Sequence, residues 1–197
     1  METSMIPVAV FFAAIFTDNI LLSNYLGMCS FLSVSKDLKA SYGLGIAVIF
    51  VMSTTSAINW GVYHFLLAPF QLEYLRFIVF IMVIAAFVQL VEMIIERVSE
   101  SLYAALGIFL PLITVNCAIL GVSLFMVIRD YNLITSFFFG LGSGVGWYLA
   151  ILSMAGILQK LKKARIPKGL EGPGITLIIT GIMAMAFMGF AGMLPTG

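Results

Sequence analysis

The chain has 197 residues, of which 62% are hydrophobic and only 10% are charged, and its formal net charge at pH 7 is +1. A soluble domain carries about 25% charged residues, so this composition excludes a water-soluble globular domain and indicates an integral membrane protein. A nearly neutral chain also gives no reason to expect nucleic acid or an acidic substrate as a partner.

Six apolar stretches are each long enough to cross a bilayer core of ~30 Å, for which a helix needs about 20 residues. They cover residues 6–35, 41–68, 75–95, 102–128, 133–158 and 174–194, with approximate ends. We predict an all-α membrane protein whose six transmembrane helices form one integral domain over residues 1–197. The longest gap, about 159–173, is too short for a soluble domain, so the chain needs partners to bind a nucleotide or a large soluble donor.

Lys and Arg are distributed unequally between the two sides of this domain. The first, third and fifth connections contain Lys36, Lys39, Arg97, Lys160, Lys162, Lys163, Arg165 and Lys168. The opposite side contains only Arg76 and Arg129. Because basic connections stay in the cytoplasm, both termini are predicted to be extracytoplasmic and the Lys-rich loop 160–168 to face the cytosol. This loop either anchors the orientation or docks a cytosolic redox subunit.

A short phrase that contains the chain's 2 cysteines occurs twice. Cys29 begins the segment Cys-Ser-Phe-Leu-Ser-Val-Ser, and Cys117 begins the segment Cys-Ala-Ile-Leu-Gly-Val-Ser. Each segment is followed by a basic–acidic pair and then by Gly-Leu-Gly. This recurrence predicts two repeats of three helices, about 1–98 and 99–197. Since three is odd, the second repeat enters the membrane from the opposite side, which makes the two repeats inverted copies.

The two helices that carry the cysteines, helices 1 and 4, are predicted to be interrupted. Polar residues lie inside both stretches, and the fourth also contains a proline: Asp18, Asn19 and Asn24 in the first, and Pro111, Thr114 and Asn116 in the fourth. Proline removes a backbone donor, and broken backbone at membrane depth requires surrounding protein or a cavity. We therefore expect both helices to break near the cysteines, and Cys29 and Cys117 to meet near the symmetry axis, close to mid-bilayer.

Several roles are open for these two thiols. Buried membrane cysteines are often inert small hydrophobic residues, and a structural disulfide is possible if the pair is close. A zinc site would be coordinatively closed and without purpose at that depth. A [2Fe–2S] cluster needs four thiolates, so Cys29 and Cys117 would supply two and a second inverted-repeat protein the other two. The matched contexts of the two cysteines favour the metal site.

Three segments carry a resemblance to a known family: Leu26–Leu32, Gly107–Ala118 and Gly189–Gly192. Over nearly its whole length the chain resembles the Nqr E and Rnf A subunits of the Na+-translocating NADH:quinone oxidoreductase and of the related ferredoxin:NAD oxidoreductase. The resemblance implies a six-helix subunit paired with an oppositely oriented homologous subunit, Nqr D or Rnf E. It also implies one [2Fe–2S] cluster between the two subunits, with Cys29 and Cys117 as this chain's ligands to the iron.

The same resemblance implies an electron-relay role in the cytoplasmic membrane of a bacterium or archaeon. Flavins (FMN, FAD or riboflavin) or iron–sulfur cofactors would lie on other subunits of the complex, and electron transfer would be coupled to export of Na+ or H+. Two features leave the branch open. Val115–Cys117, Arg129–Asn132 and Gly142–Trp147 resemble Nqr E. The short connection that ends in Glu73–Arg76 resembles Rnf A instead, although Met28–Ser30 lacks the proline that Rnf A often places after its cysteine.

A small-solute secondary transporter is the rival function, because inverted repeats, broken helices and an intramembrane acid fit that class equally well. It leaves the paired cysteines unexplained. A purely structural assembly subunit leaves the polar interruptions unexplained too.

Several residues outside the cysteine motifs also have expected roles. Asp18 is either a functional intramembrane acid or a cap for the second piece of helix 1. Glu92 is expected in an interfacial charge set at the cytoplasmic end of helix 3, and His64 in a structural role near the outer end of helix 2. The glycines of 140–146 are expected to permit tight helix packing. The aromatic belt is expected to contain Trp60, Tyr63, Tyr74 and Tyr103.

Overall fold

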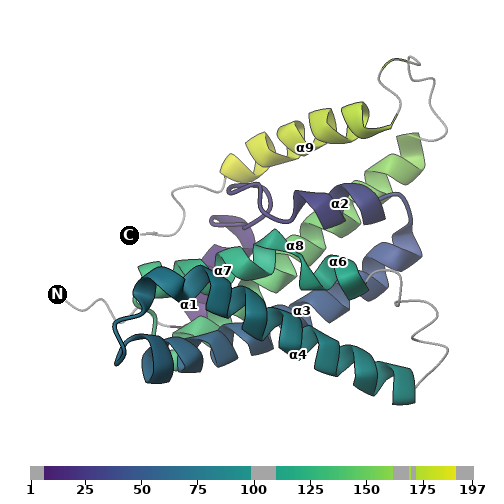
Figure 1. Ribbon diagram of the computed structural model, residues 1–197. Helices are drawn as coiled ribbons and strands as arrows, with labels where there is room; N and C mark the ends of the chain where they lie inside the picture. The colour runs from purple at the N-terminus through teal and green to yellow at the C-terminus, as the bar shows by residue number, and fades with distance from the viewer. Residues whose placement is uncertain (1–6, 99–109, 162–168, 170–171, 190–197) are drawn as a thin grey trace.

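The computed structural model describes residues 7–98, 110–161, 169 and 172–189, and these residues form helices and turns without a strand (Figure 1). The first part of the chain forms α1 (Pro7–Phe16), α2 (Met28–Val34), α3 (Leu38–Val62), the π-helical turn η1 (Tyr63–Leu67), the 3₁₀ turn η2 (Glu73–Leu75) and α4 (Arg76–Val98). The second part forms α6 (Leu110–Thr114), α7 (Cys117–Ile128), α8 (Leu133–Leu161) and α9 (Pro173–Met188).

Four helical segments among the described residues are long and apolar enough to cross a membrane: Leu38–Leu67, Glu73–Ile94, Pro111–Ile128 and Leu133–Leu161. Two shorter apolar helices, Pro7–Phe16 and Pro173–Met188, accompany them. The predicted all-α membrane class is therefore confirmed. The start of the predicted stretch 102–128, the end of 174–194 and most of the Lys-rich loop lie outside the described residues.

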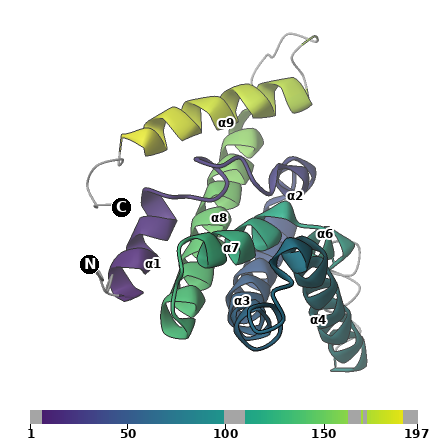
Figure 2. The same ribbon diagram turned by 60° about the vertical axis from the view of Figure 1, so that its left-hand side comes forward.

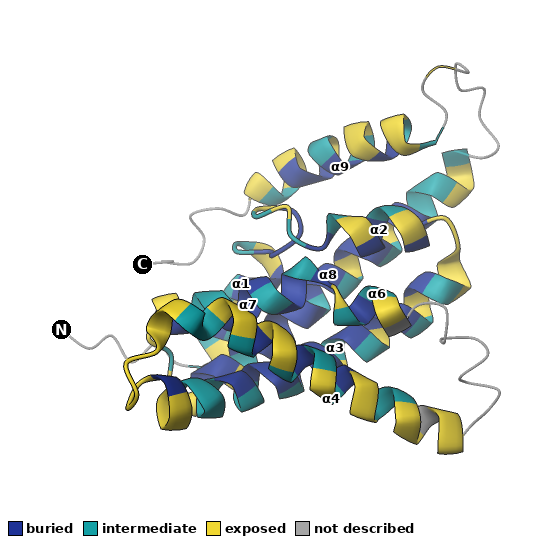
Figure 3. Cartoon of the chain, viewed as in Figure 1, coloured by how far each residue is buried: buried dark blue, intermediate teal, exposed yellow. Residues whose placement is uncertain are grey.

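The centre of the fold is the contact between α3 and α8, and α1 packs on α8 away from α3 (Figure 2). α7 lies against α3, and α4 packs on the outside of α3, α6 and α7. Figure 3 shows buried residues concentrated on α3, α7 and α8, whereas α4 and α9 expose much of their surface. The largest fully buried side chain is that of Trp147 on α8. Exposed apolar faces on the outer helices are the surfaces expected to meet lipid.

The helices begin where the local sequence allows it. The Asp37 carboxylate caps α3 by accepting a hydrogen bond from the Lys39 N–H at 3.1 Å. Pro173 stands at the first turn of α9, where its missing N–H is not needed. The buried hydroxyl of Thr55 donates to the carbonyl oxygen of Val51 one turn earlier, which gives this polar group a partner inside the bundle.

Glycines on one face of α8 allow α3 to approach closely. A Cβ built on Gly140 would lie 2.9 Å from the Met52 carbonyl oxygen, and one on Gly144 would lie 2.9 Å from the Ile49 Cα. Real Cβ atoms essentially never come this close to other heavy atoms. Any larger residue at these positions would therefore push the two central helices apart.

A second glycine face on α8 receives α1. A Cβ on Gly142 would lie 2.6 Å from the Phe11 carbonyl oxygen, and one on Gly146 would lie 3.1 Å from the Ala14 carbonyl oxygen. In a membrane, where hydrophobic burial does not drive helix association, such close backbone contact is a main source of packing energy. The expected packing role of the glycines in 140–146 is thus confirmed.

Buried side-chain hydrogen bonds also join the first part of the chain to the second. Asn59 Nδ2 on α3 donates to Ser123 Oγ on α7 at 2.8 Å. Ser56 Oγ, one turn earlier on α3, donates to the Ser136 carbonyl oxygen on α8 at 2.8 Å. These bonds fix the rotation of α3 relative to α7 and α8, because an unpaired polar group would be costly there.

We predict that Gly142→Ala destabilises the protein, because its Cβ would collide with the α1 backbone. The expected loss in the free energy of unfolding is about 1–3 kcal/mol, as for other overpacking changes. Gly156→Ala on the same helix is the matched control, since a Cβ there meets nothing within 4 Å. Thermal unfolding in detergent measures both variants. Equal midpoints for Gly142→Ala and Gly156→Ala would contradict the role given to this face.

Candidate functional site at two helix breaks

The first helix break lies between α1 and α2, over residues 17–27. Asn19, which is fully buried, organises it. Its Oδ1 accepts hydrogen bonds from the N–H groups of Leu21 at 3.1 Å and Leu22 at 3.3 Å, and its Nδ2 donates to the Ile15 carbonyl oxygen at 3.0 Å. One side chain thus serves the end of α1 and the turns that follow, which allows non-helical backbone to pass through the protein interior.

The second break separates α6 from α7 at residues 115–116. Asn116 has an extended backbone with φ −74° and ψ 111°, and its Oδ1 accepts a hydrogen bond from the Ala118 N–H at 3.0 Å. This is an N-cap, for which Asn is among the preferred residues. The cap makes Cys117 the first residue of α7.

The two breaks meet at Gly27 and Cys117. The Gly27 N–H donates a hydrogen bond to Cys117 Sγ at 2.9 Å. Gly27 precedes α2 with φ 85°, in the left-handed region that favours glycine. A Cβ at this position would also lie 2.7 Å from Trp147 Nε1 and 3.0 Å from Ala118 Cβ. Both the backbone conformation and the available space therefore require glycine.

The two cysteines differ in their environments. Cys117 is partly buried in this contact, whereas Cys29, two residues beyond Gly27 on α2, is exposed. Both thiols are free. The structure thus brings the two cysteine-bearing segments together and leaves Cys29 accessible to another chain.

The described residues alone do not form a complete metal centre. No group of three or more His, Cys, Asp or Glu side chains gathers within the part of the chain that the structure describes. Cys29 and Cys117 could provide two soft sulfur ligands, which suit iron–sulfur clusters, and Cys117 Sγ already has a backbone N–H donor. These residues fit half of a four-thiolate site, and the other half would have to come from a partner.

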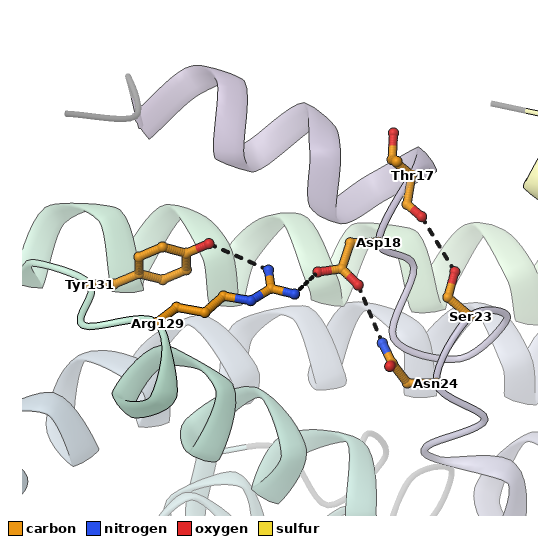
Figure 4. Close-up of polar contacts among 6 residues, drawn as sticks. All are labelled: Thr17, Asp18, Ser23, Asn24, Arg129 and Tyr131. Atoms are coloured by element: carbon orange, nitrogen blue, oxygen red, sulfur yellow. Dashed lines mark hydrogen bonds and ion pairs between the residues drawn. The ribbon is translucent and has the colours of Figure 1, made fainter. Parts of the chain in front are cut away.

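A polar cluster lies where α1 and α7 both end (Figure 4). Asp18 forms an ion pair with Arg129, and Asn24 Nδ2 donates to Asp18 Oδ1 at 3.4 Å. The Arg129 guanidinium also donates to the Tyr131 hydroxyl at 3.4 Å and lies 5.7 Å from the centre of the Phe125 ring. Asp18 is therefore neutralised by a residue from the second part of the chain.

The Arg129 guanidinium stays protonated in this cluster. Burial lowers the pKa of its guanidinium, but the hydrogen bond with Tyr131 and the attraction of Asp18 outweigh burial, so the pKa of Arg129 lies above its ordinary value. Asp18 does not cap the second piece of helix 1, because the N-cap residue of α2 is Gly27 and no side chain caps α2.

The other residues considered from the sequence lie away from the breaks. His64 is exposed and stacks on Trp60 with ring centres 4.8 Å apart, as expected for a structural role. Glu92 lies in the last two turns of α4, near the exposed residues Glu96 and Arg97. Tyr103 and most of the loop 160–168 lie outside the described residues.

Sequence reasoning missed the role of Trp147 and the pairing of Arg129 with Asp18, and it included Gly27 only as part of the segment Leu26–Leu32. Trp147 is fully buried beside Gly27, and its Nε1 has no hydrogen-bond partner in the structure. A signal for Gly27 was present, since a glycine two residues before a cysteine in a polar break suggests a positive φ. The partners of Trp147 and Arg129 depend on contacts between distant segments and leave no local signal.

A bundle of apolar helices with two polar breaks defines an integral membrane protein, and comparison with known proteins places it in a family. The chain belongs to the Rnf-Nqr family, described as "Rnf-Nqr subunit, membrane protein", whose pattern matches residues 8–194. The resemblance inferred from the sequence is therefore confirmed.

Two similar relatives represent the two branches of this family. The Nqr E protein of the Na+-translocating NADH-quinone reductase of Serratia proteamaculans is 53% identical over 191 residues, which cover 94% of this chain and 96% of the relative. The Rnf A protein of the Na+-translocating ferredoxin:NAD+ oxidoreductase complex of Acetobacterium woodii is 50% identical over 189 residues, which cover 96% and 98%. Identities this similar do not separate the branches.

We predict that Asp18→Asn lowers the thermal stability of the protein, because it leaves Arg129 without its charged partner. The expected loss is about 1 kcal/mol, the upper range for a partly exposed pair. Asp130→Asn is the matched control: it removes the same charge from a neighbouring exposed residue, and its φ of 48° suits Asn. Equal midpoints of thermal unfolding for Asp18→Asn and Asp130→Asn would contradict a stabilising ion pair between Asp18 and Arg129.

Proposed function

We propose that this protein is an electron-relay subunit of an ion-translocating membrane oxidoreductase complex of the Nqr or Rnf type. Cys29 and Cys117 supply two of the four thiolate ligands of a [2Fe–2S] cluster, and a homologous, oppositely oriented subunit of the Nqr D or Rnf E type supplies the other two. The observation that carries the proposal is the hydrogen bond from the Gly27 N–H to Cys117 Sγ, which joins the two cysteine-bearing breaks. When bound, such a cluster carries single electrons.

The position of the cysteines along their helices supports a site at mid-depth. Cys117 begins α7, whose 12 residues end beside Arg129 at the polar cluster. At about 1.5 Å per residue, α7 separates the thiol from that end by roughly 18 Å, about half the thickness of a membrane with its interfaces. A site there is within reach of donors and acceptors on both faces.

The arrangement of the helices supports inverted repeats over about 1–98 and 99–197. α3 and α8 correspond to the second predicted membrane helix of each repeat, and they pack on each other at the centre. Each is preceded by a pair of short helices around a break, α1 and α2 in one case and α6 and α7 in the other. Each is also followed by a peripheral helix, α4 or α9. A transporter of small solutes would share this plan, but it would leave the meeting of the two cysteine motifs without a purpose.

In the proposed orientation both termini are extracytoplasmic, and the membrane is the cytoplasmic membrane of a bacterium or archaeon. Flavins and further iron–sulfur centres lie on other subunits, and the coupled ion is Na+ or H+. Both relatives described above carry "Na(+)-translocating" in their names, which supports Na+. This chain's residues hold the thiols in place and keep the breaks covered by protein.

We predict that Cys29→Ala and Cys117→Ala each abolish one reduced [2Fe–2S] EPR signal of the purified complex. Loss of one thiolate leaves three ligands, which do not hold this cluster stably. Because the chain has 2 cysteines, no other residue can replace the missing sulfur from within the chain. EPR of the reduced complex, with iron analysis, measures the result.

Ser33→Ala is the matched control for this prediction, since Ser33 is an exposed residue on the same short helix as Cys29. It should leave the signal intact, with normal assembly of the complex. A full set of [2Fe–2S] signals in Cys29→Ala or in Cys117→Ala would refute the proposed function.

A further inference from the structure

The contact between Gly27 and Cys117 contains one N–H donor, and two further donors belong to side chains that lie close to Gly27. The donor in the contact is the Gly27 N–H itself, which donates to Cys117 Sγ at 2.9 Å. The other two belong to the side chains of Trp147 and Asn116. Trp147 Nε1 lies 2.7 Å, and Asn116 Oδ1 lies 3.2 Å, from the position that a Cβ of Gly27 would take. The missing side chain of Gly27 therefore lets both groups approach the backbone that binds the sulfur.

The two side-chain donors are buried and have no partner. Trp147 is fully buried and Asn116 is 3% exposed, and neither Trp147 Nε1 nor Asn116 Nδ2 makes a hydrogen bond in the structure. The orientation of the Asn116 amide is determined by its cap, because Oδ1 accepts from the Ala118 N–H and Nδ2 must then be the free end. Buried donors without an acceptor are rare, so each calls for an explanation.

We propose that the Gly27 N–H, Trp147 Nε1 and Asn116 Nδ2 form a donor pocket that stabilises negative charge on the sulfur of Cys117 and raises the reduction potential of the cluster. This inference rests on the proposed function above. Hydrogen bonds to a charged group favour its charged form, and hydrogen bonds to cluster sulfurs are one of the factors that set the reduction potential.

The direction of the effect follows from charge. One electron from a flavin or iron–sulfur donor elsewhere in the complex converts one ferric iron to ferrous, and the cluster with its ligands becomes more negative by one charge. N–H donors beside a ligand sulfur stabilise the reduced cluster more than the oxidised cluster, because the reduced cluster is the more negative of the two. The surroundings amplify the effect, because Trp147, Asn116 and Ala118 beside the contact are buried and a hydrogen bond is stronger at low dielectric constant.

Trp147→Phe tests the pocket, because it removes the indole N–H and retains an aromatic ring. We expect the midpoint potential of the cluster to shift to a more negative value in an EPR-monitored redox titration of the purified complex. Trp60→Phe is the matched control, since it is the same change at the chain's other tryptophan, whose Nε1 donates to the Tyr131 carbonyl oxygen instead. A midpoint potential in Trp147→Phe equal to that in Trp60→Phe would overturn the inference.

A second pair of variants keeps the inference testable if Trp147→Phe prevents assembly. Asn116→Ser retains an oxygen for the cap and removes the amide donor without adding a charge. Asn132→Ser is the same change at an exposed residue after α7, at its far end from Cys117. We expect a more negative potential in Asn116→Ser than in Asn132→Ser, and equal potentials would overturn the donor pocket.

The outcomes distinguish this inference from the proposed function. Absence of a [2Fe–2S] signal in the wild-type complex, or its survival in Cys117→Ala, would refute the function itself. A normal signal with an unchanged potential in the donor variants would refute the donor pocket alone.

Discussion

Close backbone contact along α8 is the constraint on which the site depends. Gly146 allows Asn19 Nδ2 and the Ala14 carbonyl oxygen to lie against α8, so the residue that organises the first break rests on this helix. The next residue on α8, Trp147, lies against Gly27 at the other end of the same break. α8 thus holds both ends of the non-helical segment. The position of Gly27, and through it the contact with Cys117, follows from how closely α1 can approach α8.

Two asparagines make the breaks possible inside an apolar bundle. Non-helical backbone leaves N–H and C=O groups unpaired, and in lipid each would be costly. Asn19 supplies both a donor and an acceptor to its break, and Asn116 supplies the cap that restarts the helix at Cys117. A leucine at either position has a higher helix propensity than asparagine, but it would leave these N–H and C=O groups without partners. Polar side chains therefore stabilise the helix breaks beside the two cysteines, although the surrounding bundle is apolar.

The sequence predicted what depends on local pattern. Long apolar stretches predicted an all-α membrane protein, and four helical segments among the described residues are long and apolar enough to cross a membrane. Non-helical residues lie at 17–27 and 115–116, close to the polar residues noted in the sequence. Contacts between distant segments could not be predicted in this way. Nothing in the sequence around Arg129 indicated its ion pair with Asp18, which the fold alone creates. The N-cap residue of α2 is Gly27 and not Asp18. The unpartnered donor of Trp147 depends on a neighbour 120 positions earlier in the chain, Gly27.

Two links join the first and second parts of the chain at opposite ends of α7. At one end the Gly27 N–H meets Cys117 Sγ, and at the other Asp18 meets Arg129. Under the proposed function, an electron that arrives near Cys117 changes the strength of a hydrogen bond whose donor belongs to the other repeat. The charge at the sulfur and the relative position of the two repeats are then thermodynamically linked. If one position of the repeats strengthens the hydrogen bond to the reduced site, reduction favours that position by the same free energy. The link does not require the coupled ion to bind at the cysteines. Under the same proposal, coupling would require two arrangements of the repeats that differ in how well they donate to Cys117, and the ion would act wherever those arrangements differ in charge.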